Sequence, residues 1–156
     1  MTFDVNNPYF RTKVLTASPE ELRMLLIEGA LRFLREGRGA MEARNYEKLH
    51  ESFSNARNII IELSSSLKRE VDPDLCGKLE AIYTYVFRLI VEGSFEKSLA
   101  KIDEAIELMD YDRETWRLLL EKLAAERSSA GAGAGAVGAE AVGAAGPGYR
   151  PLSITG

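Results

Sequence analysis

The sequence of 156 residues has a single cysteine and a single histidine, and both scarcities restrict its function. Cys76 cannot form a disulfide within the chain, which fits a protein of the reducing cytoplasm. Glu47 to His50 have the E-x-x-H spacing of di-iron helical bundles, but such sites need that motif on two helices. With His50 alone the second motif cannot be built, so we expect a surface histidine, no metal and no cofactor.

Markers of catalysis are equally scarce. A catalytic pair of a nucleophile and a histidine would have to use His50, the single histidine of the sequence. No serine or cysteine stands in a nucleophile motif. No window alternates apolar and polar residues as a strand would, so no glycine-rich phosphate loop can follow a strand. These observations predict a protein that is not an enzyme.

An excess of basic residues is also missing. The chain has 20 Lys and Arg against 24 Asp and Glu, a formal net charge of -4, and its basic residues are scattered. Nucleic acid and anionic membrane surfaces are therefore unfavourable partners. The first residues, Met1 to Asp4, do not begin a secretion signal, and the Ala/Gly-rich segment around Glu140 is too short and too weakly apolar to span a membrane. We expect a cytoplasmic protein.

Helix signals divide most of the chain. Ser18 and Glu21 form a capping box with Pro19 at the first helical position, Asn45 opens a second helix, and Asp72 with Pro73 opens a third. We expect Gly93 and Ser94 to end the third helix and cap the fourth, which runs to about residue 127. Apolar positions recur in these segments in steps of three and four, as in Leu49, Phe53, Ala56, Ile60, Leu63 and Leu67.

The predicted fold is all-α. It is an antiparallel four-helix bundle over residues 18–127, with an extended N-terminal arm over residues 1–17 and a disordered Ala/Gly-rich C-terminal tail over residues 128–156. Pro8 and the stretch from Thr16 to Pro19 argue against helix in the arm. The arm nevertheless carries Tyr9, Phe10, Val14 and Leu15, which need an apolar surface to lie against.

The helices carry more apolar side chains than their seams require. Ile59 and Ile61 flank the second seam, and Tyr83, Phe87 and Ile90 widen the third, while Leu108, Tyr111 and Leu118 lie on the back of the fourth. One interpretation is that these side chains are buried or are scattered on the surface, as monomers tolerate. The other is a groove that receives an apolar helix from a partner and that the arm covers when the partner is absent.

Several blocks in order, with matching spacing, carry a family resemblance. They are "NPY", "VLTASPEEL", "LLIEGALRFL", "ARNIIIEL", "LEAIYTYVFRLIVEG" and "IDEAIELMDYDRETW", spread over roughly residues 6–120. Together they resemble the flagellin export chaperone family, FliS. Three features depart from the family pattern: Ile27 where a tyrosine is common, the turn from Glu92 to Phe95, and the Ala/Gly-rich tail.

The resemblance implies a cytoplasmic chaperone of flagellum assembly and protein export. Such a protein binds the disordered C-terminal segment of flagellin, prevents premature polymerisation, and delivers flagellin to a component of the flagellar type III export apparatus. An N-terminal segment would cover part of the binding surface. The expected partner-binding residues are therefore Tyr9, Phe10, Val14, Leu15, Ile27, Ile59, Ile61, Tyr83, Phe87 and Ile90. The alternative is a structural helical bundle that homodimerises through its extra apolar surface.

Overall fold

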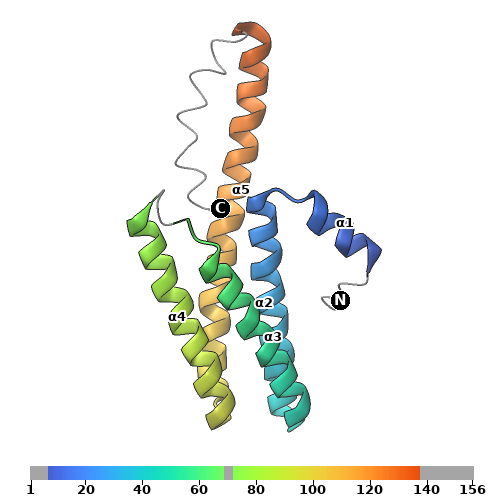
Figure 1. Cartoon of the computed structure of the whole chain (residues 1–156), viewed down its shortest axis with the longest axis vertical. Coiled ribbons are helices and arrows are strands. Elements are labelled where there is room, and N and C mark those ends of the chain that lie inside the picture. The colour runs from blue at the N-terminus through green and yellow to red at the C-terminus, as the bar shows by residue number, and fades with distance from the viewer. Residues whose placement is uncertain (1–6, 69–71, 138–156) are drawn as a thin grey trace.

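The computed structural model describes residues 7–68 and 72–137, with side-chain surroundings up to residue 131, and every regular element in these ranges is a helix. The helices are α1 (Pro8–Thr16), α2 (Pro19–Glu42), α3 (Tyr46–Ser65), α4 (Pro73–Glu96) and α5 (Leu99–Val137). Helices α2 to α5 form the antiparallel bundle (Figure 1). Around the bundle, α3 packs on α2, α2 on α5, α5 on α4 and α4 on α3. The predicted all-α bundle is confirmed.

Local capping fixes where the bundle helices begin. The Glu21 amide donates to Ser18 Oγ at 3.2 Å, which caps α2, and Ser18 Oγ in turn donates to Glu21 Oε1 at 3.1 Å. Asn45 Oδ1 accepts from the Lys48 amide at 3.2 Å, and Asp72 Oδ1 accepts from the Leu75 amide at 3.1 Å. The three predicted helix starts are confirmed.

The boundary between α4 and α5 differs from the prediction. Helix α4 passes through Gly93 and Ser94 and ends at Glu96, with Lys97 in the left-handed conformation (φ 55°) as its C-cap, and Ser98 Oγ accepts from the Lys101 amide. A Cβ on Gly93 would lie 2.7 Å from Ile102 Cδ1. Gly93 is therefore a packing residue that lets α5 approach α4, and the prediction that it ends the helix was wrong.

The N-terminal arm is helical where the sequence predicted an extended segment. Pro8 occupies the first position of α1, and Asn7 Oδ1 accepts from the Tyr9 amide at 2.9 Å. Pro8 bars the helical conformation only at the residue before it, and Asn7 is indeed extended, with φ -72° and ψ 117°. The extended-arm prediction was wrong because Asn7-Pro8 is the same cap-then-proline device that opens α2 and α4.

Helix α1 lies to one side of the bundle (Figure 1) and has no buried side chain. Tyr9 and Leu15 are 69% and 80% exposed, whereas Phe10 and Val14 are half-buried. The structure thus shows a helical arm beside the bundle with no fully buried side chain, whereas the sequence predicted an extended arm lying in a groove.

Helix α5 is longer than predicted, since it continues ten residues past Arg127 to Val137 and rises beyond the ends of the other helices (Figure 1). Extending an existing helix adds one hydrogen bond for each residue fixed, and alanine is the best helix former. The predicted start of the tail at residue 128 was therefore too early. Residues 138–156 of the predicted tail lie outside the described residues.

The core follows the predicted seams. Its largest fully buried side chains include Phe53, Leu34, Ile60, Met109 and Val86, one or more from each bundle helix. Gly37 of α2 admits the Phe53 ring so closely that a Cβ would lie 2.2 Å from Phe53 Cε1. In the part of the chain that the structure describes, no helix is long and apolar enough to cross a membrane.

Candidate partner-binding site

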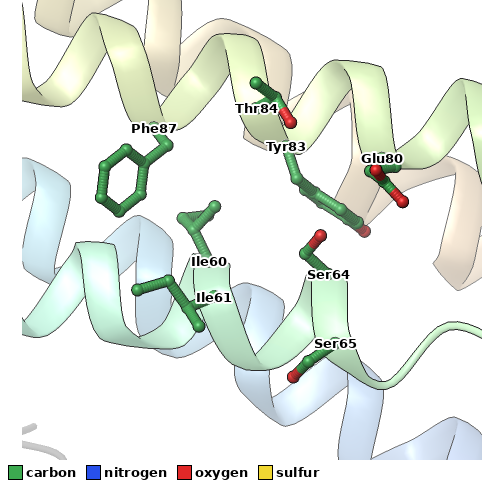
Figure 2. Close-up of a pocket in the computed structure, with 8 residues that line it drawn as sticks. All are labelled: Ile60, Ile61, Ser64, Ser65, Glu80, Tyr83, Thr84 and Phe87. Atoms are coloured by element: carbon green, nitrogen blue, oxygen red, sulfur yellow. The ribbon is translucent and has the colours of Figure 1, made fainter.

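A hollow between α3 and α4 is the candidate partner-binding site. This α3–α4 groove has a volume of about 440 Å³ and is lined by Ile60, Ile61, Ser64 and Ser65 of α3 and by Glu80, Tyr83, Thr84 and Phe87 of α4 (Figure 2). Residues three or four apart on a helix face the same side, which is why each helix contributes two neighbouring residues from each of two turns or one residue on either side of such a pair.

The two ends of the α3–α4 groove differ in polarity. Figure 2 shows Ile61 and Phe87 at one end, and Ser65 and Glu80 at the other. Ile61 is 52% exposed and Phe87 is half-buried, so the apolar end offers side-chain surface that a partner could remove from water. The site suits an amphipathic segment, with apolar contacts at one end and hydrogen bonds at the other.

Tyr83 lies between the groove and a buried polar cluster. Its ring lines the groove, but its hydroxyl accepts from Arg23 Nη2 at 2.8 Å and donates to Asp112 Oδ2 at 2.7 Å. Arg23 is 3% exposed and also donates from Nη1 to Ser66 Oγ at 3.2 Å. We call Arg23, Tyr83, Asp112 and Trp116 the buried hub, because these residues connect α2, α4 and α5.

Trp116 completes the buried hub. The guanidinium carbon of Arg23 lies 5.3 Å from the centre of the Trp116 ring and 5.6 Å from that of Tyr83, so the cation is held between two aromatic side chains. Trp116 Nε1 donates to the Glu20 carbonyl at 2.8 Å. The hub therefore ties the first turn of α2 to α5 and holds the Tyr83 ring in place from beneath the groove.

Burial shifts the titration of the hub. It raises the pKa of Tyr83, and the nearby Asp112 carboxylate raises it further against the opposing charge of Arg23. Burial likewise raises the pKa of Asp112, although the hydrogen bond from Tyr83 and the charge of Arg23 act to lower it. Tyr83 is therefore a neutral hydrogen-bonding side chain at physiological pH.

The predicted partner-binding residues fall into three groups. Ile61, Tyr83 and Phe87 line the α3–α4 groove, and Ile59 is half-buried beside it on α3. Ile27 and Ile90 are fully buried in the core, where they support the bundle from within. The four predicted arm residues are Tyr9, Phe10, Val14 and Leu15, and the structure places them together on α1, away from the groove.

Sequence reasoning missed the polar end of the groove and the centre of the hub. Ser64, Ser65, Glu80 and Thr84 carry no apolar signal and were not singled out. Arg23 had a signal, because it is the one cation inside the apolar run from Leu22 to Ile27. A charge in such a run indicates a buried, paired group.

Metal chemistry finds no support among the described residues, which contain no group of three or more His, Cys, Asp or Glu side chains able to hold an ion. His50 is exposed. Cys76 is buried, and its Sγ lies 3.3 Å from the Lys68 carbonyl, to which it donates.

Comparison with known proteins gives a consistent result. A family model described as "Flagellar protein FliS" matches residues 1–123. The flagellar secretion chaperone FliS of Bacillus subtilis is 28% identical over 130 residues, which cover 81% of this chain and 96% of that protein. The protein of the same name from Salmonella typhimurium is 27% identical over 116 residues, or 74% of this chain and 86% of that protein. The flagellar secretion chaperone FliSB of Pseudomonas aeruginosa is 30% identical and covers 67% of this chain and 82% of that protein.

Proposed function

Because the chain belongs to the FliS family of flagellar secretion chaperones, which are not enzymes, we propose that it binds the disordered C-terminal segment of flagellin in the bacterial cytoplasm. Binding there prevents premature polymerisation and supports delivery to a component of the flagellar type III export apparatus. The observation that carries this proposal is the family match over residues 1–123, which includes α1 to α4 and most of α5.

The α3–α4 groove supports the proposal. A chaperone for a disordered segment needs exposed apolar surface on a rigid support, so that the segment orders on binding. Ile61 and Phe87 provide such surface, half-buried Ile59 adjoins it, and the buried hub keeps Tyr83 fixed below it. Ile27 and Ile90 contribute as core residues that hold the binding helices in position.

Helix α1 is part of the proposed binding surface. Tyr9 and Leu15 are among the most exposed large apolar side chains of the described residues. Phe10 and Val14 line a small hollow of about 220 Å³ on α1 together with Arg11 and Leu15. Aromatic and aliphatic side chains displayed in this way favour protein contacts, so we include α1 beside the groove.

The test is calorimetric titration of the full chain with a synthetic peptide of the flagellin C-terminal segment from the same organism. We expect a negative heat-capacity change, since apolar surface is buried as the peptide orders. Ile61→Asp and Phe87→Asp should weaken peptide binding by at least about tenfold. The loss of affinity in Leu15→Asp should measure how much α1 contributes to peptide binding.

Phe95→Asp is the matched control, because Phe95 is 87% exposed at the end of α4 and outside the groove. It should bind the peptide like the unaltered chain. Equal affinities of the groove variants and the control would refute the groove as the binding site. No binding by the unaltered chain would refute the proposed function itself.

A further inference from the structure

Two hydroxyl groups in the α3–α4 groove are not used by the fold itself. Ser64 on α3 is half-buried and Thr84 on α4 is exposed, and both line the groove (Figure 2). We call them the hydroxyl pair. Neither hydroxyl forms a hydrogen bond with another residue in the part of the chain that the structure describes. A partner can therefore bind both hydroxyls without breaking a hydrogen bond within the described fold.

Two other helical hydroxyl groups provide a comparison. The Thr115 hydroxyl donates to the Tyr111 carbonyl at 2.9 Å. The hydroxyl of Ser65, which also lines the groove, donates to the Glu62 carbonyl at 3.3 Å. Such a bond to the preceding turn satisfies a serine or threonine within its own helix. The hydroxyl pair has no such bond, so its donors and acceptors face the groove and its occupant.

The hydroxyl pair lies one turn from the apolar end of the groove. Thr84 precedes Phe87 by three residues on α4, and Ser64 follows Ile61 by three residues on α3. Three residues correspond to about 4.5 Å along a helix. Because α3 and α4 run antiparallel, both steps lead in the same direction along the groove, as Figure 2 shows. The groove therefore presents an apolar layer and, one turn further, a hydroxyl layer.

A segment bound along this groove is expected to be helical. The walls of the groove are α3 and α4, whose backbone N–H and C=O groups are bonded within each helix. The walls therefore cannot pair with the backbone of an extended segment, whereas a helical segment satisfies its own backbone. On that helix, the side chains that face the apolar layer and the hydroxyl layer are three or four residues apart.

We propose that the hydroxyl pair binds an asparagine or glutamine of the flagellin segment, three or four residues from the apolar side chain that contacts Ile61 and Phe87. This inference rests on the proposed function. A hydroxyl both donates and accepts, and so does a carboxamide, so one amide side chain can bond both members of the pair. A lysine or arginine there would lose water beside an apolar surface, at a greater cost than a neutral amide. The Glu80 carboxylate, one turn along α4, disfavours an acidic side chain.

Calorimetric titration of the full chain with the synthetic flagellin C-terminal peptide tests the hydroxyl pair. Ser64→Ala and Thr84→Val each remove one hydroxyl, so each should weaken peptide binding by about three- to tenfold. Both variants should retain the thermal stability of the unaltered chain, because neither hydroxyl bonds to another described residue. Thr115→Val is the matched control, since Thr115 is exposed on α5 outside the groove, and it should bind within about twofold of the unaltered chain.

Substitutions in the peptide identify the bound side chain. Each asparagine is replaced in turn by leucine and each glutamine by methionine, which removes the hydrogen-bonding atoms and nearly keeps the size. One of these replacements should weaken binding by about three- to tenfold. Its combination with Thr84→Val should cause little further loss, because both changes remove the same hydrogen bond.

The outcomes separate this inference from the proposed function. Absence of binding by the unaltered chain would refute the proposed function and the inference together. If the peptide binds, but Ser64→Ala and Thr84→Val behave like Thr115→Val, the inference alone is overturned. It is also overturned if the groove variants lose thermal stability along with affinity, or if every asparagine and glutamine replacement is additive with Thr84→Val.

Discussion

At the residue scale, Arg23 shows how one charged side chain organises the bundle. It is 3% exposed and has hydrogen bonds to Tyr83 and Ser66 and ring contacts to Tyr83 and Trp116. A buried cation is tolerated only when its donors and its charge are satisfied. The Tyr83 hydroxyl links this cation to an acidic side chain, because it accepts a hydrogen bond from Arg23 and donates one to Asp112.

Removing that hydroxyl should therefore destabilise the fold. Tyr83→Phe leaves Arg23 and Asp112 without their shared partner and should lower the free energy of unfolding by about 1–3 kcal/mol. Urea unfolding measures the change. Tyr111→Phe removes the same atom from a 73% exposed ring and should have an effect within about 0.5 kcal/mol. Similar losses in both variants would show that the hub does not depend on the Tyr83 hydroxyl.

At the element scale, close contacts between helices decide which glycines matter. Gly37 and Gly39 lie two residues apart in α2, yet Gly37 faces the ring of Phe53 and Gly39 has open space around it. The helix α3 seam can approach α2 only because Gly37 has no side chain. A sequence pattern alone gives both residues the same low helix propensity.

The pair provides a matched test. Gly37→Ala should destabilise the bundle by about 1–3 kcal/mol, because a Cβ 2.2 Å from Phe53 Cε1 forces the ring or α3 to move. Gly39→Ala should be neutral or should stabilise by up to about 1 kcal/mol, since alanine is the better helix former. Thermal and urea unfolding compare the two. A stabilised Gly37→Ala variant would mean that Phe53 has another position available.

At the scale of the whole molecule, pH acts on surface pairs and on the hub in opposite directions. Arg38 holds the pKa of the exposed Asp103 below its usual value, so that pair stabilises the fold at higher pH and the effect is lost as the pH falls. Burial raises the pKa of Asp112 above its ordinary 3.8. The contribution of Asp112 to the free energy of unfolding is therefore complete below pH 3.8, and it is lost as the pH rises through the folded-state pKa.

Comparison with Asp112→Asn isolates the buried group. Asparagine cannot ionise, so the unfolding free energy of the variant, relative to that of the unaltered chain, should increase as the pH rises from about 4 to about 7. Urea unfolding across this range measures the difference, and the surface pairs cancel because both proteins contain them. A difference that falls with pH would mean that the Asp112 carboxylate stabilises the fold in its charged form.

Local chemistry in the sequence determined where the bundle helices begin and which of their positions are buried. Ser18, Asn45 and Asp72 cap their helices through atoms within three residues, so no distant contact is needed to place them. The same information predicted Ile61 and Phe87 at the candidate site. The sequence also contained the cap at Asn7, because Pro8 excludes the helical conformation only at the residue before it.

Only the tertiary structure decided the features that depend on a neighbouring helix. It made Gly93 a contact for Ile102 rather than a helix end, placed Arg23 inside the bundle, and set α1 apart from the groove. It also decided which flanking side chains remain exposed, since a position beside a seam is covered or free according to the angle and distance of the adjacent helix. Those quantities arise from contacts between residues far apart in the chain, which periodicity within one helix does not contain.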